Sequence, residues 1–179
     1  METQALSFKK SSFNYGLILG GILAIVTSSI YALNMELLTK WWLGIILFFI
    51  GICVGFVSVA KSKSILEGVI SFKEAFTSYF ITLAVGLFIN MAVAILIFVV
   101  IDPDAAVFLQ EKIIELSRSM LESFGVPEEE INKAITDMEN ENSYSFGNQL
   151  QSYVFQLLFY SVFGLLVSLI MKKNDPSLD

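Results

Sequence analysis

Residues 41–60 read WWLGIILFFIGICVGFVSVA, which is twenty consecutive residues without a charged side chain. At a rise of about 1.5 Å per residue, a helix of this length extends about 30 Å, the thickness of the hydrocarbon core of a bilayer. A strand of a membrane β-barrel would alternate between apolar and polar residues over about ten positions, and this stretch does not alternate. Residues 41–60 are therefore predicted to form a membrane-spanning helix.

Three further stretches are long and almost free of charge, and they cover about residues 13–33, 72–101 and 150–171. The whole chain is 55% hydrophobic and 16% charged. A soluble domain usually carries about 25% charged residues. The sequence therefore predicts an all-α fold, namely an integral membrane four-helix bundle that forms a single domain over residues 1–179.

The basic residues are distributed unevenly between the two sides of the predicted bundle. The N-terminal tail, the loop 61–75 and the C-terminal tail together hold seven of them: Lys9, Lys10, Lys61, Lys63, Lys73, Lys172 and Lys173. The other side holds four, of which three are spread over a long loop: Lys40, Lys112, Arg118 and Lys133. Cytoplasmic segments close to spans are enriched in Lys and Arg. Both termini are therefore predicted to be cytoplasmic, with the loop 102–149 outside.

The loop 102–149 holds eleven of the seventeen acidic residues and shows the pattern of two amphipathic helices. Asp102 and Pro103 suit the start of the first helix, Gly125 suits its end, and the second helix is predicted to open with Pro127. Apolar residues recur every three or four positions along the first helix, at Ala106, Leu109, Ile113, Leu116, Met120 and Phe124. The second helix has a similar stripe at Ile131, Ala134, Ile135 and Met138. The loop is predicted to be a helical hairpin.

The apolar and the acidic faces of this hairpin are expected to have different roles, namely packing and partner recognition. The apolar faces should seal against one another and against the ends of the spans. Glu111, Glu115 and Glu122 lie on the opposite face of the first helix, where Arg118 is placed to pair with Glu115 and Glu122. We expect this acidic face to stay solvated and to be the place where a protein partner is recognised.

Two pairs of glycines in the spans have the four-residue spacing that lets membrane helices approach closely: Gly16 with Gly20, and Gly51 with Gly55. Either these glycines pack helices within one bundle, or they form the contact of a homo-oligomer. Ser11 and Ser12 precede the first apolar stretch, and one or the other is predicted to cap its helix.

Asn90 is a lone amide near the middle of the third span, and Gln156 is a second one in the fourth. A polar group within the membrane usually faces the bundle interior and finds a partner there. Structural hydrogen bonding is the preferred interpretation of Asn90, and a role in permeation or ligand binding is the alternative.

Several kinds of chemistry are not expected. The chain has no histidine, which is the commonest general base and metal ligand, and its single cysteine cannot form an intramolecular disulfide. Apart from Glu74 in the first turn of the third, no span carries a carboxylate, and no glycine-rich phosphate loop or calcium-loop spacing occurs. We therefore expect no catalytic residues, no metal site and no cofactor. Nucleic-acid binding is not expected either, because no basic face is present.

Short motifs distributed over nearly the whole chain resemble the bacterial membrane protein family called domain of unknown function 4199. They are Tyr15-Gly16-Leu17 with Gly20, Gly68 to Phe76, Ile101-Asp102-Pro103, Pro127 to Ile131, and Lys172-Lys173. The resemblance implies a multi-pass protein of the bacterial inner membrane, and it implies no particular activity.

Three hypotheses for the function remain from the sequence. The preferred one is a non-enzymatic inner-membrane protein that acts through protein interaction, with its partner at the outer loop. The first alternative is a small transporter or channel, which Asn90 and the glycine pairs favour and the absence of ionisable residues inside the spans opposes. The second is a membrane sensor whose outer loop binds a ligand. In all three, the lipid bilayer surrounds the spans and a homo-oligomer remains open.

Overall fold

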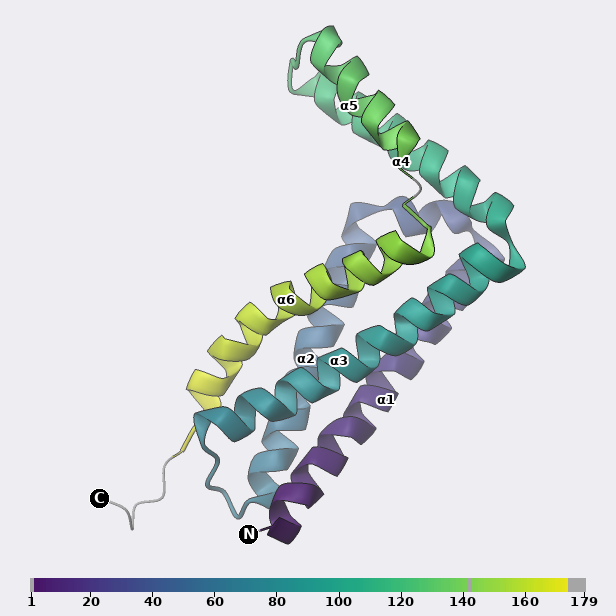
Figure 1. Ribbon diagram of the computed structural model, residues 1–179. Coiled ribbons are helices and arrows are strands. Elements are labelled where there is room, and N and C mark those ends of the chain that lie inside the picture. The colour runs from purple at the N-terminus through teal and green to yellow at the C-terminus, as the bar shows by residue number, and fades with distance from the viewer. Residues whose placement is uncertain (1, 142, 174–179) are drawn as a thin grey trace.

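The computed structural model describes residues 2–141 and 143–173, and within them the chain is helical and contains no β-strand (Figure 1). The α-helices are α1 (Glu2–Leu33), α2 (Trp41–Ile65), α3 (Phe72–Ile95), α4 (Pro103–Ser123), α5 (Glu128–Asn140) and α6 (Phe146–Met171). A short 3-10 helix, η1 (Met35–Thr39), joins α1 to α2, and a π-helical segment, η2 (Leu96–Ile101), continues α3.

Four helices of the described chain are long and apolar enough to cross a membrane, and they cover Leu6–Leu33, Trp41–Ile65, Phe72–Ile101 and Phe146–Met171. The predicted four-helix membrane bundle is thus confirmed. Helices α1, α2 and α6 extend beyond the predicted charge-free stretches, because flanking Lys, Ser and Asn residues continue them, whereas the third span keeps its predicted bounds. The fourth helix accordingly begins at Phe146, four residues before the predicted start.

Helix α3 is the central element of the bundle, and it packs against α1, α2 and α6. Figure 1 shows that α1 begins and α6 ends at the same end of the bundle, which we call the terminal end. The hairpin of α4 and α5 lies at the opposite end, which we call the hairpin end. At the terminal end, Ile70 and Lys173 exchange two backbone hydrogen bonds of 3.1 and 2.9 Å. These bonds tie the α2–α3 connection to the end of α6.

The predicted glycine pairs lie where helices of this same chain come closest. A Cβ atom added at Gly16 would lie 2.6 Å from Cβ of Val85, and one added at Gly20 would lie 2.7 Å from Cβ of Ile89. Both contacts are between α1 and α3. A Cβ closer than 3.0 Å to another atom forces that atom to move, so α1 and α3 approach this closely only because these positions are glycine.

Each glycine of the second pair lies against the aromatic ring of a tyrosine from another helix. Cβ atoms added at Gly51 and Gly55 would lie 2.8 Å from Tyr160 and 2.5 Å from Tyr79. The other edge of the Tyr79 ring faces Gly164 of α6, where an added Cβ would lie 2.6 Å away. The ring of Tyr79 therefore fills a slot between a glycine of α2 and a glycine of α6.

The first helix of the hairpin, α4, begins and ends where the sequence predicts. The carboxylate of Asp102 accepts a 3.0 Å hydrogen bond from the backbone N–H of Ala105, with Pro103 at the first helical position. Gly125 has φ +72°, which a glycine adopts without strain at the end of α4. The second carboxylate oxygen of Asp102 accepts a 2.8 Å hydrogen bond from the hydroxyl of Tyr31. The start of the hairpin is thereby fixed to α1.

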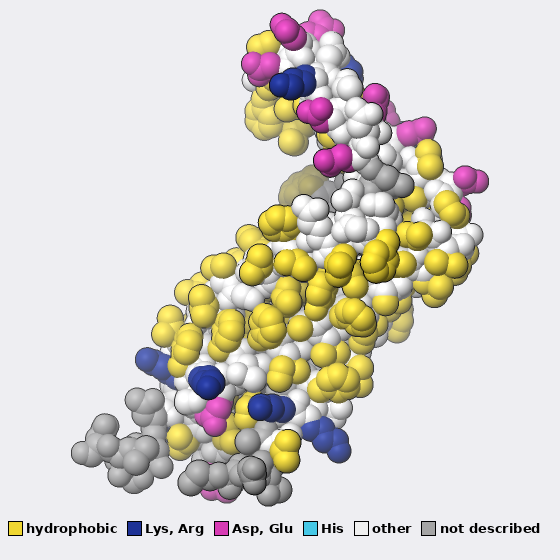
Figure 2. Space-filling model, viewed as in Figure 1, with side chains coloured by type: hydrophobic (Ala, Val, Ile, Leu, Met, Phe, Trp, Pro, Cys, Tyr) yellow, Lys and Arg dark blue, Asp and Glu magenta, His cyan; other side chains and the backbone are white. Residues whose placement is uncertain are grey.

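The expected sealing of the apolar face of α4 holds for its first turns and is wrong for its second half. Leu109 is fully buried with Ile97 and Phe98 of η2, whereas Met120 and Phe124 are 57% and 74% exposed. Helix α4 is about 30 Å long and extends past the end of the spans, so only its first turns lie over them (Figure 1). Figure 2 shows hydrophobic side chains on the side of the hairpin tip that faces back toward the spans.

Candidate functional site

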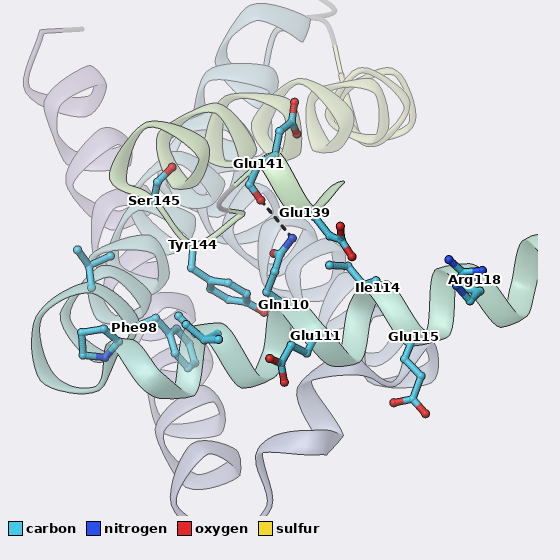
Figure 3. A pocket seen from close by; sticks show the side chains of 14 residues that line it. Phe98, Gln110, Glu111, Ile114, Glu115, Arg118, Glu139, Glu141, Tyr144 and Ser145 are labelled. Carbon is cyan, nitrogen blue, oxygen red and sulfur yellow. Dashed lines mark hydrogen bonds between the residues drawn. The ribbon is translucent and has the colours of Figure 1, made fainter. Parts of the chain in front are cut away.

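A cleft of about 790 Å³ lies at the hairpin end, between η2, α4 and the segment that joins α5 to α6 (Figure 3). Its apolar lining consists of Phe98, Val99, Pro103, Ala106, Val107, Ile114 and Tyr144. Its polar lining consists of Gln110, Glu111, Glu115, Arg118, Glu139, Glu141 and Ser145. Volumes of about 300–1,000 Å³ and this mixture of apolar walls with a few polar groups are typical of ligand sites.

The π-helical segment η2 shapes one wall of the cleft. The backbone N–H of Asp102 donates to the carbonyl of Ile97 over 2.8 Å, a bond that spans five residues rather than four. Such π-helical turns are rare and often lie at functional sites, because they rotate the following side chains relative to an α-helix. Phe98 stands with its ring 5.2 Å from that of Tyr144 and 6.0 Å from that of Tyr31, measured between centroids.

Gln110 of α4 is the polar residue at the inner part of the cleft. Its Nε2 donates to the carbonyl of Met138 over 2.9 Å and to that of Glu141 over 3.1 Å, and the second bond is drawn in Figure 3. Both bonds tie α4 to the end of α5. These two bonds use both amide hydrogens. Its Oε1 is buried and has no donor within the part of the chain that the structure describes. An unsatisfied buried acceptor costs about 1–3 kcal/mol, so this oxygen is suited to a donor that a ligand brings.

Two of the three predicted interaction residues, Glu111 and Glu115, line the cleft, while Glu122 lies outside it and is exposed. Their carboxylates extend from α4, and those of Glu139 and Glu141 come from the opposite side, at the end of α5 (Figure 3). The rim of the cleft is therefore rich in negative charge.

The predicted ion pairs of Arg118 are wrong. Lys112 donates to Glu115 over 2.8 Å, and this hydrogen bond lowers the pKa of the Glu115 carboxyl and raises the pKa of Lys112. Arg118 instead donates to Oδ1 of Asn132 over 3.1 Å, across the hairpin. The reason is tertiary: α5 packs against α4 on the side of Arg118, which a pattern within α4 alone does not reveal.

The residues that line the cleft indicate what kind of ligand it fits. Burial raises the pKa of Tyr144 to about 12, so its phenol is neutral at physiological pH. Among the described residues, no three His, Cys, Asp or Glu are placed to hold a metal ion. An apolar floor, a free acceptor and an acidic rim together fit a ligand that is partly apolar and carries positive charge or N–H donors.

The structure also contains a polar cluster in the spans that the sequence analysis missed. It is a group of fully buried hydroxyls from α1, α2 and α3: Ser12, Ser58, Ser62, Ser78 and Thr82. Ser12 and Ser62 each lie 2.8 Å from the hydroxyl of Ser78, and Thr82 donates to Ser58 over 2.7 Å. The prediction that Ser11 or Ser12 caps the first helix is wrong, because both lie inside α1, which begins at Glu2. The four-residue spacing of the hydroxyls within α2 and α3 is the signal that could have located the cluster.

The lone amide Asn90 is hydrogen-bonded within the bundle. Thr27 of α1 donates to its Oδ1 over 3.0 Å, so α1 and α3 are connected by a polar contact inside the membrane. Asn90 and Gln156 also line one cavity of about 430 Å³ between the spans.

Comparison with known proteins gives one family. The family described as protein of unknown function (DUF4199) matches residues 14–173. No curated protein and no solved structure matches the chain.

Proposed function

Because the chain belongs to the DUF4199 family, whose function is unknown, we propose its role from the cleft at the hairpin end. The protein is a non-enzymatic, multi-pass protein of a bacterial inner membrane that binds a basic, partly apolar segment of a partner protein in this cleft. The observation that carries the proposal is Oε1 of Gln110, a buried acceptor that has no donor among the described residues and lies beneath an acidic rim.

The chemistry of the cleft supports a peptide segment as the ligand. A backbone N–H or a lysine ammonium supplies the donor that Gln110 lacks. The carboxylates of Glu111, Glu139 and Glu141 attract basic side chains and raise the rate of encounter. The volume of about 790 Å³ accommodates a few side chains of a partner rather than a folded domain.

The first prediction concerns the acidic rim. The double variant Glu111→Gln/Glu139→Gln keeps the shape of both side chains and removes two charges. We expect a synthetic peptide of alternating lysine and leucine to bind the full-length protein in detergent about 2- to 30-fold more weakly after this change, since each exposed pair contributes about 0.2–1 kcal/mol. Binding of the unchanged protein should weaken as salt rises. Fluorescence anisotropy of the labelled peptide measures both effects.

The matched control is Glu122→Gln, which removes an exposed carboxylate of the same helix outside the cleft. This variant should bind the peptide like the unchanged protein. A photo-crosslinking residue at Val107, which is 57% exposed in the wall of the cleft, then identifies the partner in living cells. Equal loss of binding in the Glu122 variant, or no loss in the double variant, would contradict a specific site in the cleft.

The second prediction concerns orientation: both termini lie in the cytoplasm and the hairpin lies outside. Basic side chains gather at the terminal end, whereas acidic side chains cover the hairpin (Figure 2). Cys53, the only cysteine, is removed by Cys53→Ala, and a cysteine is then introduced by Glu129→Cys in the hairpin or by Ser177→Cys in the C-terminal tail. A membrane-impermeant maleimide should label the first variant in spheroplasts and the second only after lysis. The reverse pattern would mean that the protein is inserted the other way round.

A further inference from the structure

A second cavity lies within the spans, away from the cleft. It has a volume of about 430 Å³ and is bordered by residues of α1, α2, α3 and α6. Most of its lining is hydrocarbon or aromatic, including Leu23, Leu47, Leu87, Phe48, Phe155 and Phe159. Its polar side-chain groups are the amides of Asn90 and Gln156 and the hydroxyl of Tyr160, which donates to the carbonyl of Phe48 over 3.4 Å. A cavity in the membrane region that brings together two amides from different helices needs a physical explanation.

The hydrogen bonding of Asn90 determines what it offers to this cavity. Its Oδ1 accepts from Thr27, which leaves its Nδ2 hydrogens without an acceptor among the described residues. Gln156 makes no hydrogen bond within the described chain, and its side chain is exposed on the surface of the bundle. The cavity therefore presents amide donors.

Asn90 lies too deep for bulk water to satisfy it. It is about 16 Å along the helix axis from Ile101, the last residue of its span, whereas Gln156 is about 9 Å from Leu150, where the apolar stretch of α6 begins. In the hydrocarbon region, an amide without a partner is unfavourable, because no water replaces the missing hydrogen bond.

We infer that this cavity binds a lipid-soluble molecule whose carbonyl oxygen accepts hydrogen bonds from the amides of Asn90 and Gln156. The aromatic rings of Phe48, Phe155 and Phe159 surround the apolar body of this molecule. Because Gln156, Phe155 and Phe159 are exposed on the bundle surface, a molecule dissolved in the bilayer reaches the cavity without passing through water. Two sources supply such a carbonyl, namely the ester group of a membrane lipid and the ring of a quinone.

Gly44 provides a variant that fills the cavity without disturbing the bundle. It lines the cavity, and a Cβ added there would meet no atom within 4 Å. The variant Gly44→Leu therefore places a side chain where the ligand is expected. Gly21 of α1 is the matched control, because its added Cβ also meets no atom within 4 Å and it does not line the cavity.

The test compares thermal-unfolding midpoints of the full-length protein in nanodiscs of ester-linked or ether-linked phosphatidylcholine, the latter with and without 2-methyl-1,4-naphthoquinone. Greater stability in ester lipid identifies the lipid carbonyl, and stabilisation by the naphthoquinone in ether lipid identifies the quinone. Either effect should be lost in Gly44→Leu and kept in Gly21→Leu. In Gln156→Leu the ligand should bind about two- to tenfold more weakly, corresponding to one hydrogen bond. If neither ligand distinguishes the unchanged protein from Gly44→Leu, the cavity binds no carbonyl compound and the inference is wrong.

Discussion

Gly55→Leu is expected to prevent the bundle from closing. A Cβ atom at this position would lie 2.5 Å from Cε2 of Tyr79 and 2.9 Å from Cδ2 of Leu83. The Tyr79 ring cannot retreat, because Gly164 of α6 lies against its other edge and the residue is 1% exposed. Even a few extra carbon atoms in a filled core cost about 1–3 kcal/mol, and leucine adds four. The variant should yield little monodisperse protein in mild detergent.

Smaller substitutions separate this steric effect from a general intolerance of the spans. Gly55→Ala should lower the free energy of unfolding by about 1–3 kcal/mol. Gly21→Ala, which has open space at its Cβ, should be neutral or gain up to about 1 kcal/mol from helix propensity. Combining Gly55→Ala with Tyr79→Leu should recover part of the loss, since the two changes share one contact. A Gly55→Leu protein as stable as the unchanged one would show that Tyr79 does not occupy this slot.

A related expectation follows from the hydroxyl of Tyr79, which is buried and has no hydrogen-bond partner within the described part of the chain. The substitution Tyr79→Phe removes this hydroxyl and keeps the ring, so it should eliminate the desolvation cost of the hydroxyl while the ring still fills the slot. The ring, rather than the hydroxyl, is therefore what the slot between Gly55 and Gly164 requires.

The spans could be predicted because their signal is local. A charge-free length of about 20 residues is sufficient for a bilayer, and no knowledge of neighbouring helices is needed. The hairpin boundaries at Asp102, Pro103 and Gly125 were equally local, since each residue acts on its own turn of backbone. Which helices pack against one another could not be predicted in this way, because it depends on contacts between distant parts of the chain. Nothing in the sequence of α3 alone indicates that it contacts three other spans.

The candidate cleft was predictable only in part for the same reason. The periodicity of α4 placed Glu111 and Glu115 on one face, and both line the cleft. Gln110 carried no signal, because its role depends on carbonyls at the end of α5, about thirty positions later in the chain. The predicted pairing of Arg118 with Glu115 and Glu122 is wrong because it rested on the spacing within α4 alone, whereas the partner of Arg118 is Asn132 of α5. The role of the hydroxyls between helices was not predicted either. Ser12 was predicted to lie at the start of a helix, whereas this helix begins at Glu2.

The hydroxyl cluster leads to the last prediction, in which the size of the residue at position 78 matters more than its polarity. The Ser78 hydroxyl lies at the centre of the cluster, 2.8 Å from those of Ser12 and Ser62. Ser78→Ala removes it, but Ser12 still donates to the carbonyl of Phe8 over 2.8 Å. Hydrogen bonds between membrane helices average about 0.6 kcal/mol and reach about 1.7 kcal/mol, so the alanine variant should lose no more than this.

Ser78→Leu should be far more damaging, because it adds a branched side chain at a fully buried position where α1, α2 and α3 meet. Overpacking costs about 1–3 kcal/mol or more, and the larger side chain also separates the remaining hydroxyls from one another. Ser29→Leu is the control, since Ser29 is exposed on α1 and a leucine there faces lipid. Thermal unfolding in one detergent should rank Ser29→Leu with the unchanged protein, Ser78→Ala slightly below, and Ser78→Leu lowest. If the alanine and leucine variants were equally unstable, the hydrogen bonds rather than the close packing would hold these three helices together.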